Sequence, residues 1–193
     1  MTEAYRRVTP YLALVGLAAA VTLRVQVAGQ AGVRSETAAI WFAVALAAVA
    51  LVTQQQDVPT GRTPRAVGLG VVGAAVLCLP ALARHAVIGG GVVPPTDGYA
   101  RWAVFVVAVA VAEEALLRGS LYRAIEQQAG DTLAIAVTSI AFGLLHAPVY
   151  GWGVVPLDIA VGVWFGTLRA LAGSVTAPAV AHAVADLAGW WLR

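Results

Sequence analysis

Two adjacent carboxylates interrupt a long apolar run in the middle of the chain. Glu113 and Glu114 follow the sequence WAVFVVAVAVA, and Arg118 lies four residues after Glu114. A carboxylate at the centre of a bilayer costs about 2.5–3.5 kcal/mol on insertion scales, so each requires a partner unless the pair marks a helix end at the interface. Glu114 and Arg118 share one helical face and are predicted to form a structural ion pair. Glu113 then lacks a local countercharge, which makes it the candidate acid–base group.

A histidine is predicted to lie at the same membrane depth as Glu113. His146 ends the apolar stretch TLAIAVTSIAFGLLHAP, and we expect the two helices to form an antiparallel hairpin around Gln127–Asp131. Glu113 lies 17 residues before Gly130 and His146 lies 16 residues after it. At about 1.5 Å per residue, both are about 24–26 Å from the turn if the helices are straight.

A second histidine and a carboxylate share a face of the last apolar stretch. His182 and Asp186 are four residues apart in SVTAPAVAHAVADLAGWWL. Asp186 could hold the imidazole in one tautomer, or both side chains could face a substrate or an ion. Counted from the loop at Gly173, His182 is a few residues shallower than the other two sites, a difference that helix tilt or a bend at Pro178 would absorb.

These four residues fit hydrolysis by an activated water molecule. Glu113 would act as the general base, and His146 would position the water. His182 and Asp186 would stabilise the oxyanion or orient the scissile carbonyl. An ionised Asp186 would repel an oxyanion, so it would need to be protonated or to act only through His182.

Metal chemistry is an alternative that the sequence leaves open. Glu113, His146 and His182 are acceptable ligands for a zinc ion, with water completing a tetrahedral site. Neither an HExxH motif nor a GxSxG motif occurs, and the single cysteine, Cys78, excludes a disulfide or CxxC site. Asp158 follows Pro156 in the first turn of a predicted helix and is interpreted as structural.

Membrane helices are expected to carry these residues. The chain is 60% hydrophobic and 11% charged, whereas soluble domains are about 45–50% apolar and about 25% charged. Seven stretches approach the length that a membrane helix needs. They run roughly over 11–28, 38–52, 66–88, 99–125, 132–147, 154–168 and 174–192. We therefore predict an all-α, polytopic transmembrane bundle of about seven helices, with three spans in 1–98 and four in 99–193 forming one continuous membrane domain.

The charge pattern indicates membrane partners. Every basic residue other than histidine is an arginine, the net charge is +2, and the arginines lie near segment ends without forming a basic stripe. This excludes an obvious nucleic-acid partner and suits membrane anchoring, with a modest bias towards a cytoplasmic N-terminus. The expected partners are the lipid bilayer and a peptide or membrane-protein substrate.

Three short motifs occur in order along the second half of the chain. They are Glu113-Glu114-xxx-Arg118, Phe142-xxx-His146 and His182-xxx-Asp186, with Gly119 after the first motif and Gly173-Ser174 and Pro178 leading to His182. Over roughly residues 99–189 the pattern resembles the CAAX prenyl protease and bacteriocin-processing family (CPBP, or Abi), type II CAAX prenyl endopeptidase-like. The last motif position is commonly Asn in that family, whereas this chain has Asp186.

The resemblance implies an all-helical intramembrane endopeptidase, glutamate-dependent or metal-assisted. By analogy, Glu113 and His146 would activate water, His182 and Asp186 would form an oxyanion site, and Glu114 and Arg118 would be structural. The short, arginine-only chain suggests a bacterial plasma membrane, and a peptide, bacteriocin precursor or membrane protein as substrate. The alternatives are a non-catalytic immunity or scaffold protein of the same fold, a small proton-coupled transporter, and, more remotely, a bis-His haem protein.

Overall fold

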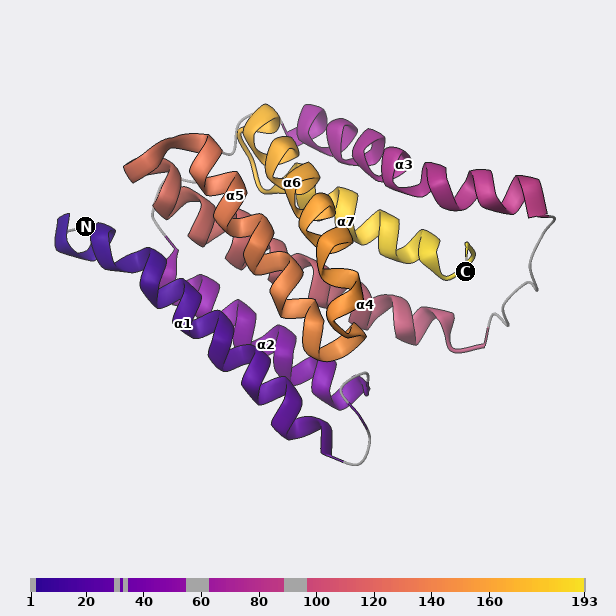
Figure 1. The fold of residues 1–193 in the computed structure, drawn as a ribbon, viewed down its shortest axis with the longest axis horizontal. Coiled ribbons are helices and arrows are strands. Elements are labelled where there is room, and N and C mark those ends of the chain that lie inside the picture. Colours follow the sequence, from indigo (N-terminus) through magenta and orange to yellow (C-terminus); the bar gives the residue numbers. More distant parts are fainter. Residues whose placement is uncertain (1–2, 30–31, 33–34, 55–62, 89–96, 193) are drawn as a thin grey trace.

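The structure is a computed structural model that describes residues 3–29, 32, 35–54, 63–88 and 97–192. Within these ranges every regular element is a helix (Figure 1). The α-helices are α1 (Glu3–Ala28), α2 (Glu36–Thr53), α3 (Thr63–Ile88), α4 (Tyr99–Glu114), α5 (Tyr122–Tyr150), α6 (Val155–Ala172) and α7 (Thr176–Gly189). A π-helix, η2 (Ala115–Leu121), joins α4 to α5, and a 3-10 turn, η3 (Trp152–Val154), precedes α6.

All seven predicted stretches fall largely on helices, and the predicted turn of the hairpin lies at Gly130. This residue has φ 80° and ψ 172°, so it breaks α5 into two limbs. Glycine adopts such a positive φ without the steric cost that a Cβ atom would bring. The first limb continues α4 and η2, and the second limb corresponds to the predicted stretch 132–147. The prediction of an all-helical membrane bundle is confirmed.

The last helix is shorter than predicted. In the part of the chain that the structure describes, five continuous helical stretches are long and apolar enough to cross a membrane, and one of them, Tyr99–Tyr150, contains both limbs around Gly130. Helix α7 has 14 residues, or about 21 Å at 1.5 Å per residue, which is less than the hydrocarbon thickness of about 30 Å. It begins two residues after Ser174, where the chain leaves α6 through Gly173 in a left-handed conformation.

The outer surface of the bundle is apolar, as lipid contact requires. Large hydrophobic side chains such as Val15, Leu51, Val72 and Leu157 are more than 60% exposed. An exposed apolar surface of this extent would be unfavourable in water and is favourable against lipid chains. The chain is therefore an integral membrane protein.

The helices of the second half lie between the helices of the first half. In Figure 1, the α1–α2 pair lies on one side of the group α4–α7, and α3 lies on the other side. The most extensive helix contacts join α3 to α7, α5 to α6 and α1 to α2. The motif-bearing helices α4, α5 and α7 thus occupy the interior of the bundle.

Glycines allow α5 and α6 to approach closely. A methyl group added at Gly162 would lie 2.8 Å from Ser139 Cα, and one added at Gly143 would lie 2.5 Å from Ile159 Cγ1. A methyl group at Gly166 would lie 3.1 Å from Ile135 Cγ2. Small residues at matched positions are a common means of bringing membrane helices together.

Candidate functional site

The candidate site begins where α4 changes into a π-helix. Glu113 and Glu114 are the last two residues of α4, and the π-helix η2 starts at Ala115. Both side chains are buried, with Glu113 2% and Glu114 0% exposed. Short π-helical segments within α-helices often occur at functional sites, and this one has no signature in the periodicity of the sequence.

Glu114 and Arg118 form a fully buried ion pair. Arg118 Nη1 donates to Glu114 Oε1 at 3.0 Å, and both side chains are 0% exposed. Arg118 Nη2 donates to the carbonyl oxygen of Gly162 on α6, also at 3.0 Å. The guanidinium lies over the rings of Phe142 and Phe165, 4.8 Å and 5.4 Å from their centroids. These contacts connect η2 to α5 and α6.

His182 lies at the centre of three carboxylates. Its Nδ1 atom is 3.1 Å from Glu114 Oε1, and its Nε2 atom is 3.5 Å from Asp186 Oδ2 and 3.9 Å from Glu113 Oε2. The imidazole stacks on the Phe165 ring with centroids 4.9 Å apart. Both ring nitrogens of His182 therefore face carboxylate oxygens, and the aromatic stacking fixes the plane of the ring.

Glu113 and Glu114 each have one buried carboxylate oxygen, Oε2, without a hydrogen-bond partner among the described residues. Glu114 is held through its other oxygen, which accepts a hydrogen bond from Arg118 and lies 3.1 Å from His182 Nδ1, whereas the ring nitrogen nearest to Glu113 Oε2 is the His182 Nε2 atom at 3.9 Å. Leaving a buried carboxylate oxygen without a hydrogen bond is costly, and such groups in native proteins call for an explanation such as a catalytic role. Glu113 is thus available to a water molecule or a substrate.

His146 contacts the cluster through an aromatic ring. The Phe142 ring packs edge-on against both histidines, with centroids 4.7 Å from His146 and 5.5 Å from His182. His146 Nδ1 lies 3.0 Å from the Phe142 carbonyl oxygen and 3.5 Å from Asp158 Oδ2 on α6. The structure therefore gathers Glu113, His182 and Asp186 directly and adds His146 beside them.

The predicted zinc ligands are not arranged as a metal site. Among the residues that the structure describes, no group of three or more His, Cys, Asp or Glu side chains is positioned to hold a metal ion. Zinc binding by Glu113, His146 and His182 stays a prediction.

Sequence reasoning missed two charged residues near the cluster. Arg24 of α1 is 9% exposed, lies over the Phe42 ring at 4.7 Å, and interacts electrostatically with Glu113. Its position inside the first apolar run could have marked it, because charged residues within membrane segments are usually functional. Asp158 was interpreted as structural, and the structure brings it beside His146.

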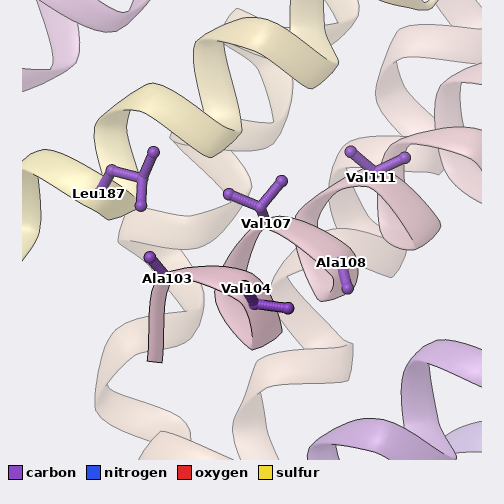
Figure 2. A pocket seen from close by; sticks show the side chains of 6 residues that line it. All are labelled: Ala103, Val104, Val107, Ala108, Val111 and Leu187. Carbon is purple, nitrogen blue, oxygen red and sulfur yellow. The ribbon is translucent and has the colours of Figure 1, made fainter. Parts of the chain in front are cut away.

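An apolar groove lies between α4 and α7 beside the cluster. Figure 2 shows the side chains of Val107 and Leu187 facing this groove, which has a volume of about 520 Å³. Val111, another lining residue, is two positions before Glu113, and Leu187 directly follows Asp186. Where α4 begins and α7 ends, next to this groove, Tyr99, Trp102, Trp190 and Trp191 form an aromatic cluster, which is typical of a membrane interface.

Comparison with known protein families finds a match in the second half of the chain. Residues 95–188 match the family model described as type II CAAX prenyl endopeptidase Rce1-like. The match includes all three motifs and confirms the resemblance that they predicted. Searches of curated proteins and of solved structures found no match to the chain.

Proposed function

Because residues 95–188 belong to the Rce1-like family of type II CAAX prenyl endopeptidases, we propose that the chain is an intramembrane endopeptidase. It hydrolyses a peptide bond in a membrane-associated peptide or protein. The observation that carries this proposal is the buried Glu113 carboxylate, whose Oε2 atom has no hydrogen-bond partner in the described part of the chain and lies 3.9 Å from His182 Nε2.

Glu113 acts as the general base for water. The carboxylate accepts a proton from a water molecule, whose oxygen atom attacks the carbonyl carbon of the scissile bond. The attack produces a tetrahedral oxyanion. When the carbon–nitrogen bond breaks, the proton held by Glu113 passes to the leaving amine, so the carboxylate is regenerated.

His146 positions the attacking water. It shares the Phe142 ring with His182, which supports a location beside the reacting carbonyl. Its Nδ1 atom already faces the Phe142 carbonyl oxygen and Asp158. The Nε2 atom is therefore the ring nitrogen that hydrogen-bonds the water.

His182 stabilises the oxyanion, and Asp186 acts through His182. The His182 Nε2 atom lies between Glu113 and Asp186, where an N–H group can also donate to a developing oxyanion. An ionised Asp186 would repel the oxyanion directly, so its role is to hold the ring. Glu114, held in turn by Arg118, fixes the opposite side of the ring through Nδ1.

The test is cleavage of a membrane-peptide library in proteoliposomes by the wild type and by Glu113→Gln. This substitution keeps the side-chain size and removes the base. We expect kcat to fall at least about 100-fold, the lower range for loss of a general base, while the variant keeps the wild-type melting temperature. Glu126→Gln is the matched control, because Glu126 is partly exposed and faces Arg169 at 3.9 Å, outside the cluster. Chelator added to the wild type tests for metal assistance.

Two outcomes would contradict the proposal. Equal cleavage by wild type and Glu113→Gln would remove Glu113 as the base. Absence of cleavage by the wild type across the library would favour the alternative of a non-catalytic membrane protein of the same family, in which the buried charges serve only to hold the helices together.

A further inference from the structure

Asp158 and His146 are brought together by the packing of α5 on α6. Asp158 lies in the first turn of α6, and its Oδ2 atom is 3.5 Å from His146 Nδ1. Both side chains are mostly buried, 20% and 14% exposed. A carboxylate at a helix N-terminus is favourable without any partner, so the position of Asp158 on its helix does not by itself explain the contact with the imidazole.

The register of the two helices holds this contact in place. Gly162 packs against Ser139, and Gly143 packs against Ile159. At Gly143, an added methyl group would also lie 3.0 Å from the backbone oxygen of Val155. The close approach therefore continues to the first turn of α6, one helical turn from His146, and the backbone on both sides is tightly constrained.

Two oxygen acceptors meet the same ring nitrogen of His146. The Phe142 carbonyl oxygen is 3.0 Å from Nδ1, and the Asp158 carboxylate is 3.5 Å from it. A carbonyl oxygen and an ionised carboxylate both accept hydrogen bonds and have no hydrogen to donate. Nδ1 must therefore carry the hydrogen, which leaves the Nε2 lone pair of the neutral ring available as an acceptor.

The other charged groups that act on the His146 imidazole are basic side chains. Arg24 of α1, Arg118 of η2 and His182 of α7 each interact with His146 electrostatically. The Tyr150 ring on α5 lies 5.7 Å from the imidazole. Asp158 is the group that brings negative charge to Nδ1 from α6.

We propose that Asp158 is a positioning residue that, with the Phe142 carbonyl, fixes His146 in the Nδ1–H tautomer and directs Nε2 towards the catalytic water. The catalytic part of this inference rests on the proposed function, whereas the tautomer part rests on the geometry alone. Carboxylates that orient a functional histidine in this way are worth 10–100-fold in activity when they support a metal ligand, and the same orienting role applies to a water-positioning imidazole.

The tautomer is measured by ¹⁵N NMR of histidine-labelled protein in detergent micelles, with the signals of His146 assigned by comparison with His146→Gln. The wild type is expected to show the Nδ1–H form. In Asp158→Ala, the Nε2–H population is expected to rise at least about threefold. Asp158→Asn keeps one oxygen acceptor and is expected to lie between the two. Glu3→Gln, which alters a first-turn carboxylate on α1, is the matched control for the helix N-terminus.

The kinetic arm uses the same variants in the cleavage assay. We expect kcat to fall about 10–100-fold in Asp158→Ala, with KM within twofold of the wild type, and to fall about three- to tenfold in Asp158→Asn. If Asp158→Ala does not fold, the Asp158→Asn result decides: wild-type kcat in that variant would overturn the positioning role.

The outcomes separate this inference from the proposed function. An unchanged tautomer population in Asp158→Ala would overturn the inference even if cleavage were reduced, because reduced cleavage alone could follow from a loss of structure. A shifted tautomer population in a protein that cleaves nothing would support the geometric part while the proposed function fails.

Discussion

Arg118 is the residue on which the buried cluster depends most. Its guanidinium donates to Glu114 Oε1 and to the Gly162 carbonyl and covers two aromatic rings. Arg169 Nε in turn donates to the Arg118 carbonyl oxygen at 3.0 Å. Glu114 also contacts His182. The position of the His182 ring therefore depends on a chain of contacts that begins at Arg118.

Removing Arg118 should destabilise the protein strongly. Arg118→Leu leaves Glu114 as a buried charge without its cation, which typically costs about 3–5 kcal/mol. We expect a large drop in melting temperature in detergent, measured by circular dichroism or by dye-based thermal unfolding. Arg7→Leu is the matched control, because Arg7 forms the same four-residue pairing with Glu3 at an exposed position. Exposed ion pairs of this kind contribute little to the free energy of unfolding.

A double substitution tests the origin of this effect. Glu114→Leu with Arg118→Leu removes both charges together, so its loss of stability should be smaller than the sum of the two single losses. Strict additivity would contradict the view that the single losses arise from the uncompensated partner.

The candidate site was only partly predictable at the residue scale. The four-residue spacing predicted that Glu114 and Arg118 would pair, and the structure has them 3.0 Å apart. The contact between Glu114 and His182 spans 68 positions in sequence. It depends on how α4 and α7 are rotated about their axes, which no local pattern specifies. The same reason explains why Asp158 was interpreted as a helix-end carboxylate only.

At the scale of the elements, the α5–α6 interface sets the geometry of the site. Gly162 serves two purposes there, since it lets α6 approach Ser139 and it presents its carbonyl oxygen to Arg118. Gly143 brings the start of α6 close to α5, near His146. These glycines therefore place groups from α6 beside residues of η2 and α5.

Widening this interface by one methyl group should lower both stability and activity. In Gly162→Ala the new Cβ would meet the Ser139 Cα at 2.8 Å, and a backbone atom cannot move aside without shifting its helix. Overpacking of this kind costs about 1–3 kcal/mol. We expect a lower melting temperature. We also expect kcat to fall by more than the fraction of unfolded protein at the assay temperature accounts for. Gly189→Ala is the control, because a methyl group there would meet no atom of the described residues within 4 Å. An equal effect of both substitutions would contradict the packing argument.

The elements themselves were more predictable than their details. Apolar length located each helix, and glycine with polar neighbours located the turn at Gly130. The π-helix Ala115–Leu121 was not predictable, because its hydrogen-bond shift leaves the apolar pattern unchanged. Helix α7 was predicted too long because the aromatic residues after Gly189 extend the apolar run without extending the helix.

At the scale of the whole molecule, the first three helices support the motif-bearing helices. The α1–α2 pair supplies Arg24, which interacts electrostatically with Glu113, and the Ala50 carbonyl, which accepts a hydrogen bond from Ser120 of η2 at 3.0 Å. Helix α3 packs along α7, where a methyl group added at Gly70 would lie 2.6 Å from the Ala177 carbonyl oxygen. We predict that the two halves form one continuous membrane domain.

The arrangement of the helices also makes the membrane topology testable. Gln128 Nε2 donates to the Arg6 carbonyl oxygen, so the N-terminal end of α1 and the turn at Gly130 lie at the same end of the bundle. The second limb of α5 covers 131–150, about 30 Å of helix, so Trp152 lies near the opposite membrane surface.

Single cysteines at Glu3, Gln127 and Trp152, in a Cys78→Ser background, can be labelled with a membrane-impermeant maleimide in intact cells and in inverted vesicles. The arginine bias predicts labelling of Glu3→Cys and Gln127→Cys in the inverted vesicles and of Trp152→Cys in the intact cells. The reverse pattern would invert the predicted orientation, whereas labelling of Glu3→Cys and Gln127→Cys from different sides would contradict the hairpin at Gly130.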